Sequence, residues 1–128
     1  MTAWLWVRED VVYAIHDAQL AEHGGLSGLI DGGRLEAALG RPQNLTAYEN
    51  PDAATLAASY AYGLVRNHPF ADGNKRTGWV VARLFLADNG YRFGSDPADA
   101  VRTMESVAAG TLSESALADW FRQRILNL

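Results

Sequence analysis

The chain has 128 residues, of which 48% are hydrophobic and 20% charged, and its formal net charge at pH 7 is −4. We expect a single domain over residues 1–128, because this length suits one domain and the apolar fraction suffices for a core. The acidic balance argues against nonspecific nucleic-acid binding, and the absence of cysteine excludes disulfides, Cys-zinc sites and thiol catalysis. Neither a signal peptide nor a membrane span is predicted, so we expect a soluble cytoplasmic protein without direct nucleic-acid or membrane contacts.

Hydrophobic spacing and punctuating residues divide the first part of the chain into two helices. The first is predicted over residues 8–23, where a pair of glycines ends it. Asp31 is predicted to cap a short second helix that Gly40 and Pro42 close. Residues 41–50 show no period and are expected to form a loop.

A central helix is predicted to follow that loop. In the run Asn50, Pro51, Asp52, the asparagine would cap the helix, proline suits its first position and the aspartate complements the helix dipole. The apolar period continues to Asn67, and Pro69 then prevents further helix.

The second half of the chain continues this helical pattern. A helix over residues 74–89 is predicted to form the core pair with the helix over residues 52–67, since these two are the most apolar. Residues 91–93 could be a strand, although the sequence shows no obvious partner for them. Another helix is predicted from Asp96 to Gly110.

The last predicted helix could begin in either of two ways. Thr111 and Glu114 could form a capping box, and Ser113 is an equally good cap. Its apolar period extends to Ile125. Together these elements predict a compact all-α bundle of about six helices.

The stretch from His68 to Gly78 lies between the two core helices and concentrates polar side chains. A helix that begins near Gly73 has unpaired amides and the positive end of its dipole there. Lys75 and Arg76 add full positive charges in the first turn, where cations oppose the dipole. This conflict is resolved if the site normally binds an anion, for which phosphate is the obvious candidate.

His68 and Asp72 could supply chemistry beside such a phosphate. A carboxylate next to phosphate oxygens suits Mg²⁺, and a neutral imidazole can accept a proton from an attacking hydroxyl. Phe70 would anchor the loop in the core. Taken singly, Asp72 could be a helix cap, His68 an ordinary polar residue and the two cations solvated, but the combination favours phosphoryl or nucleotidyl transfer.

The remaining histidines and tryptophans carry no comparable pattern. His16 and His23 are expected to be polar residues on the surface or partly buried, since no metal-ligand spacing accompanies them. The tryptophans are interpreted most simply as core or edge packing, with an adhesive surface as the alternative for Trp4 and Trp6. The sequence contains no P-loop and no Gly-x-Ser-x-Gly elbow.

The central motif reads His68-x-Phe70-x-Asp72-Gly73-Asn74-Lys75-Arg76. It resembles the signature of the Fic/Doc superfamily, and in particular that of the death-on-curing (Doc) toxins, which ends in Asn-Lys-Arg. The similarity extends over roughly residues 15–94, including the segments 24–28 and 34–43. The resemblance implies a compact all-α fold, a bacterial toxin–antitoxin role, ATP as phosphate donor and Mg²⁺.

The resemblance also implies roles for the motif residues. His68 would deprotonate the target hydroxyl and Asp72 would bind Mg²⁺, while the nucleotide would be held by Gly73, Asn74, Lys75 and Arg76, the last also serving catalysis. Doc-like proteins transfer the γ-phosphate of ATP to a threonine of elongation factor Tu and so block translation. A cognate antitoxin would supply a C-terminal segment that folds onto the toxin and blocks the site.

Lys75 is the residue that distinguishes two related activities. Fic enzymes that transfer AMP resemble this motif but carry glycine at that position, and a lysine side chain would fill the space that glycine leaves. The resemblance therefore implies a kinase. An AMP transferase and a non-catalytic interaction domain are the alternatives.

Overall fold

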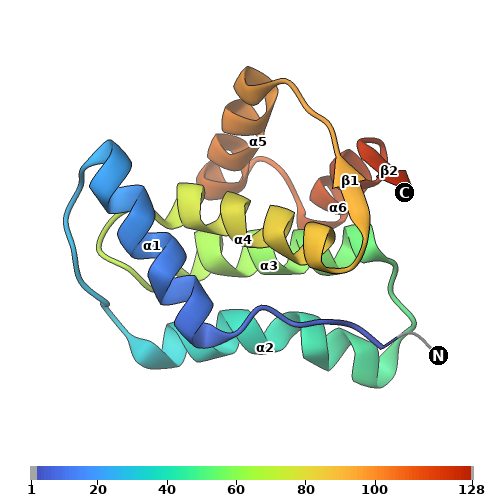
Figure 1. Cartoon of the computed structure of the whole chain (residues 1–128), viewed down its shortest axis with the longest axis horizontal. Helices are drawn as coiled ribbons and strands as arrows, with labels where there is room; N and C mark the ends of the chain where they lie inside the picture. The colour runs from blue at the N-terminus through green and yellow to red at the C-terminus, as the bar shows by residue number, and fades with distance from the viewer. Residues whose placement is uncertain (1–2, 128) are drawn as a thin grey trace.

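The computed structural model describes residues 3–127, so residues 1, 2 and 128 of the predicted 1–128 domain lie outside it. This part of the chain forms six helices and one short two-stranded sheet, arranged as in Figure 1, which confirms the predicted all-α bundle. None of these helices is both long and apolar enough to cross a membrane. In chain order the elements are α1 (Glu9–His23), α2 (Gly32–Tyr48), α3 (Ala53–Asn67), α4 (Asn74–Asp88), β1 (Tyr91–Phe93), α5 (Pro97–Ala109), α6 (Glu114–Arg122) and β2 (Ile125–Asn127).

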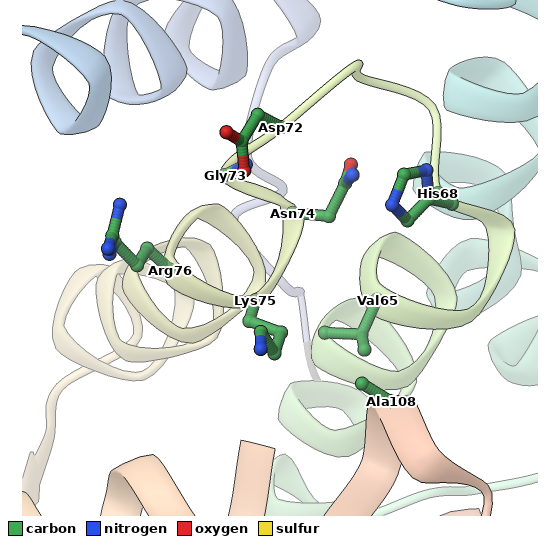
Figure 2. A pocket seen from close by; sticks show the side chains of 8 residues that line it. All are labelled: Val65, His68, Asp72, Gly73, Asn74, Lys75, Arg76 and Ala108. Carbon is green, nitrogen blue, oxygen red and sulfur yellow. The ribbon is translucent and has the colours of Figure 1, made fainter. Parts of the chain in front are cut away.

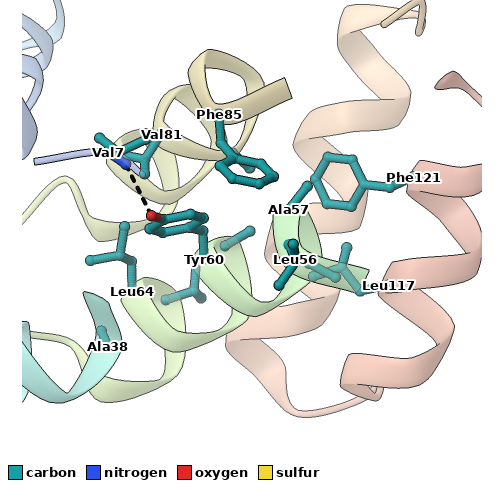
Figure 3. Packing of buried hydrophobic residues seen from close by; sticks show 14 of the residues in the cluster. Val7, Ala38, Leu56, Ala57, Tyr60, Leu64, Val81, Phe85, Leu117 and Phe121 are labelled. Atoms are coloured by element: carbon teal, nitrogen blue, oxygen red, sulfur yellow. Dashed lines mark hydrogen bonds between the residues drawn. The ribbon is translucent and has the colours of Figure 1, made fainter. Parts of the chain in front are cut away.

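Helix α3 is the centre of the bundle. It packs against α2, α4 and α6, and the predicted core pair of α3 and α4 is therefore confirmed. Figure 3 shows side chains of α3, including Leu56, Tyr60 and Leu64, between those of the neighbouring helices. All three are fully or almost fully buried. Removal of their apolar surface from water fixes the two helices that flank the motif loop.

The N-terminal segment covers one edge of this core. The backbone N–H of Val7 donates to the Tyr60 hydroxyl at 3.0 Å, which satisfies the polar end of a buried ring (Figure 3). The rings of Trp4 and Trp6 lie 5.7 and 5.9 Å from the ring of Phe85. Both tryptophans are partly buried against the core, which favours packing over the adhesive surface that the sequence also allowed.

Helix α2 is longer than the sequence predicted. It continues through Gly40 and Pro42 to Tyr48, so the expected loop over residues 41–50 is wrong. Proline in a helix interior costs about 3 kcal/mol relative to alanine, and burial of one apolar face offsets that cost. The buried residues recur at helical spacing along this face and include proline itself: Leu35, Ala38, Leu39 and Pro42.

Helix α3 begins later than predicted, because its cap is Asp52 and not Asn50. The Asp52 carboxylate accepts from the backbone N–H of Thr55 at 2.9 Å, and Pro51 lies before the cap. The same carboxylate accepts from Arg122 Nε at 2.7 Å. The Arg122 guanidinium and then the Thr55 donors lower the pKa of Asp52.

The substitution Asp52→Ala should lower the free energy of unfolding by about 1–2 kcal/mol at neutral pH, after discounting the exposed ion pair. Because the pKa of Asp52 is lower in the folded state, its contribution is present above the unfolded pKa and is lost as the pH falls through the folded pKa. The difference between variant and wild type in urea unfolding should therefore shrink toward about pH 3. Asp119→Ala is the control, since Asp119 also binds Arg122 but caps no helix; an equal loss there would contradict the capping role.

The C-terminal elements resolve one alternative and correct one prediction. Ser113 caps α6, since its hydroxyl accepts from the backbone N–H of Ala116 at 3.1 Å. The last helix ends at Arg122, and Ile125 lies in β2 instead of continuing that helix. The missing partner of residues 91–93 is this strand, which pairs antiparallel with Phe93 opposite Ile125.

Candidate active site

The loop between α3 and α4 begins at His68, which ends α3 in the left-handed conformation with φ of 51°. Within residues 3–127 it is the only non-glycine residue with positive φ. This conformation reverses the chain direction at once, and the following Pro69 prevents α3 from continuing. The His68 side chain is exposed at the end of a buried helix.

The segment between α1 and α2 holds the outer side of this loop. The Pro69 carbonyl accepts from the backbone N–H of Ile30 at 2.7 Å, and the N–H of Ala71 donates to the Gly28 carbonyl at 3.0 Å. These two bonds tie the loop to a segment that precedes it by about forty residues. The loop is therefore fixed by main-chain bonds as well as by the helices at its ends.

Asn74 holds the inner side of the loop. Its Oδ1 accepts from the backbone N–H of Phe70 at 3.1 Å, and its Nδ2 donates to the Phe70 carbonyl at 2.9 Å. Phe70 is 1% exposed and Asn74 5% exposed. The Asn74 side-chain amide, which the family resemblance assigned to the nucleotide, is thus engaged with the loop backbone.

Asp72 lies at the mouth of α4 with an exposed carboxylate. Its Oδ1 accepts from the N–H of Gly73 at 2.8 Å and its Oδ2 from the N–H of Leu26 at 3.3 Å. The Gly73 bond, then the Leu26 bond, and also the charge of Arg76, lower its pKa, so the group is an anion at neutral pH. At Gly25 a Cβ would lie 2.7 Å from Oδ2, so the carboxylate occupies space that only glycine leaves.

The start of α4 is an uncapped, positively charged helix end. Gly73 is the N-cap in the left-handed conformation and no side chain caps the helix, so the helix-cap explanation for the preceding aspartate does not apply. Lys75 and Arg76 are exposed, and neither forms an ion pair within the described residues. Figure 2 shows Lys75 extending toward Val65 and Ala108, and Arg76 extending away from His68. Free amides and two unpaired cations make this end attractive to an anion.

All the predicted site residues line one pocket (Figure 2). Its volume of about 330 Å³ is sufficient for a small ligand. A second hollow of about 620 Å³ lies against Arg34 and Arg66 and shares His68 with the first. The first pocket is lined by Val65, His68, Asp72, Gly73, Asn74, Lys75, Arg76 and Ala108.

One residue at the site was missed by the sequence reasoning. His16 on α1 is 3% exposed, and its Nε2 lies 2.8 Å from the Asp72 carbonyl oxygen. Its ring also stacks on Phe70 with the centroids 3.8 Å apart. No spacing signal marks it, because the contact joins residues 56 positions apart. In residues 3–127 no three His, Asp or Glu side chains group as a metal site.

The fold and this pocket define a small helical protein in which an uncapped helix start with two cations lies beside a histidine and an aspartate. The chain belongs to the Fic/DOC family, whose model matches residues 6–86. That match covers α1 to most of α4 and includes the whole motif loop.

Two relatives carry names that narrow the resemblance from the whole family to the Doc toxins. The chain is 39% identical over 118 residues to "Protein kinase doc" of Escherichia phage P1, covering 91% of this chain and 93% of that protein. It is 41% identical over 93 residues to "Toxin Doc" of Mycolicibacterium smegmatis, covering 70% of this chain and 67% of that protein. The resemblance to Doc toxins is therefore confirmed.

Proposed function

We propose that this chain, acting as one domain over residues 1–128 in the bacterial cytoplasm, is the toxin of a toxin–antitoxin pair. In this proposal it is a protein kinase that transfers the γ-phosphate of ATP to a threonine of elongation factor Tu and so inhibits translation. The names of the two relatives support the toxin and kinase assignments. The geometry of the pocket supports the chemistry.

The observation that carries the proposal is the unpaired positive charge at the start of α4. Lys75 and Arg76 lie in the first turn of α4, where cations are unfavourable unless an anion is bound, and the first amides of this helix have no partner within it. The Lys75 and Arg76 side chains and the first amides of α4 are hydrogen-bond donors, which suit the oxygens of a triphosphate. Gly73 is required by its φ of 79°, and a Cβ there would lie 3.6 Å from the His16 ring of α1.

Asp72 fits Mg²⁺ that arrives with the nucleotide. A single ionised carboxylate lines the pocket, and Mg²⁺ is commonly held by one or two carboxylates together with phosphate oxygens. Asp72 would hold the ion, which when bound neutralises phosphate charge. No further carboxylate or imidazole completes a cage within the described residues, so nucleotide phosphates would supply other ligands.

His68 lines both hollows. This place suits a general base that lies between ATP as the phosphate donor and threonine as the phosphate acceptor. The threonine hydroxyl would enter from the side of Arg34 and give its proton to the His68 imidazole. Its oxygen bonds to the γ-phosphorus while the bond from that phosphorus to the bridging oxygen breaks, and ADP leaves. Arg76 would balance charge on the phosphates during this transfer.

Elongation factor Tu incubated with the protein and Mg-ATP tests this function directly. Label should reach elongation factor Tu from γ-labelled ATP and not from α-labelled ATP, and intact-mass measurement should show one added phosphate. Label from the α position would instead establish AMP transfer. No label from either position, with nucleotide bound, would contradict the target assignment.

Lys75 decides between the kinase and the AMP transferase. Because its side chain fills space that a glycine would leave open, Lys75→Gly should reduce γ-phosphate transfer by at least about tenfold through loss of a charged phosphate contact. Lys75→Arg, which keeps the charge, is the matched control. Unchanged γ transfer in the glycine variant would contradict this role.

Chemical labelling gives an independent readout on Lys75, because it is the only lysine in the chain. Mg-ATP should protect it from an amine-reactive reagent, with the N-terminal amine as the internal reference. Equal labelling with and without Mg-ATP would place the nucleotide elsewhere.

The proposed partner is an antitoxin whose C-terminal segment folds onto the toxin and closes the site. The segment beside the motif loop exposes three large apolar side chains, Leu26, Leu29 and Ile30, which suit such a segment. Loss of phosphate transfer on addition of the antitoxin segment as a peptide tests this step.

A further inference from the structure

His16 is a buried polar residue that the proposed reaction does not use. It comes from α1, outside the motif, and an imidazole taken out of water requires a hydrogen-bond partner to offset its desolvation. That partner is the Asp72 carbonyl oxygen, 2.8 Å from Nε2. Because a carbonyl only accepts, Nε2 carries the hydrogen and donates it.

This bond fixes more than one atom of the loop. The peptide bond between Asp72 and Gly73 is planar, so holding its carbonyl oxygen also sets the direction of the Gly73 N–H on the opposite side. That N–H donates to Asp72 Oδ1 at 2.8 Å. His16 therefore acts on the carboxylate through the peptide that follows it.

The ring of His16 is itself held in place. It stacks on Phe70 at 3.8 Å with 11° between the planes, and the main chain of Phe70 is held by the Asn74 side-chain amide. The loop is thus clamped between α4 and α1, which Figure 1 shows crossing the end of the α3–α4 pair.

We propose that His16 is a positioning residue, whose Nε2–H sets the Asp72–Gly73 peptide and thereby aims the Asp72 carboxylate into the nucleotide pocket. The effect of this positioning on Mg-ATP binding rests on the proposed function. The hydrogen bond itself does not depend on that function, so it has a readout of its own.

The test compares two variants. His16→Phe keeps a ring on Phe70 but removes the donor. His16→Gln restores a donor, because the glutamine Nε2 is the same number of bonds from Cα as the histidine Nε2. In the phenylalanine variant the Gly73 amide should exchange its hydrogen several-fold faster by NMR, and Mg-ATP binding by calorimetry should weaken about tenfold. The glutamine variant should recover most of both. Nucleotide binding in EDTA should change little, because Lys75 and the amides of α4 remain.

Tyr13→Leu is the matched control, because Tyr13 also packs on Phe70 from α1, at 6.0 Å, whereas the bond to the Asp72 carbonyl comes from His16. If this variant weakens Mg-ATP binding as much as His16→Phe, the effect is general loosening of α1 and the proposal fails. Gly73 exchange that stays at the wild-type rate in His16→Phe also overturns it. A wild-type protein that does not bind Mg-ATP would overturn the proposed function, while the exchange measurement would still decide the role of His16.

Discussion

Replacement of His68 by alanine should reduce phosphate transfer by about 10²–10⁴-fold, the usual contribution of a positioned general base. The imidazole is the one group on the wall between the two hollows that can accept the proton of an entering hydroxyl. Expression of the wild type should arrest growth, and expression of the variant should not. Initial rates with γ-labelled ATP and circular dichroism of both proteins measure activity and fold.

The backbone at His68 demands a second variant. Its φ of 51° is unfavourable for alanine, so loss of activity in His68→Ala could include a displaced loop. Asparagine tolerates this conformation and provides no base, so His68→Asn should keep the loop and still be inactive. Growth arrest by both variants would favour the non-catalytic interaction domain over the kinase.

Helix starts and stops could be predicted where one side chain decides them locally. Asp31, Ser113 and Gly110 act at helix ends as the sequence indicated. The extent of α2 could not be predicted, because Gly40 and Pro42 are unfavourable for a helix and packing of α2 against the rest of the fold, mainly α3, compensates for them. Local propensity was outweighed by burial.

The strand pairing shows the same limit. Residues 91–93 find their partner more than thirty positions away, in residues 125–127, of which the apolar period had assigned Ile125 to the last helix. A strand of three residues carries no period of its own, so its partner is visible only once the helices are packed.

In the candidate site, too, some residues could be predicted from the sequence and others could not. The motif from His68 to Arg76 is contiguous, so its chemistry could be interpreted from the sequence and its residues do line one pocket. The groups that position the motif loop come from α1 and from the segment after α1. They are His16 and the main chain at Leu26 and Ile30. Only the fold brings them to the loop.

Phe70→Ala should cost about 3–5 kcal/mol of unfolding free energy, a large part of the roughly 5–15 kcal/mol available to a domain. The ring is 1% exposed and packs against His16 and Tyr13, so its removal leaves a cavity under the motif loop. Urea unfolding followed by fluorescence measures this loss. A cost below about 1 kcal/mol would show that the loop is not anchored by this ring.

Because the alanine variant could be largely unfolded, the milder pair Phe70→Leu and Phe85→Leu separates anchoring of the site from general stability. Both rings are buried, but Phe85 packs against Trp4, Trp6 and Tyr60, away from the loop. Each change should destabilise the protein by about 1–2 kcal/mol. Only Phe70→Leu should weaken Mg-ATP binding, by about tenfold, because it alone removes the surface on which His16 stacks. Equal weakening in both variants would mean that nucleotide affinity follows overall stability, and that Phe70 does not position the site residues.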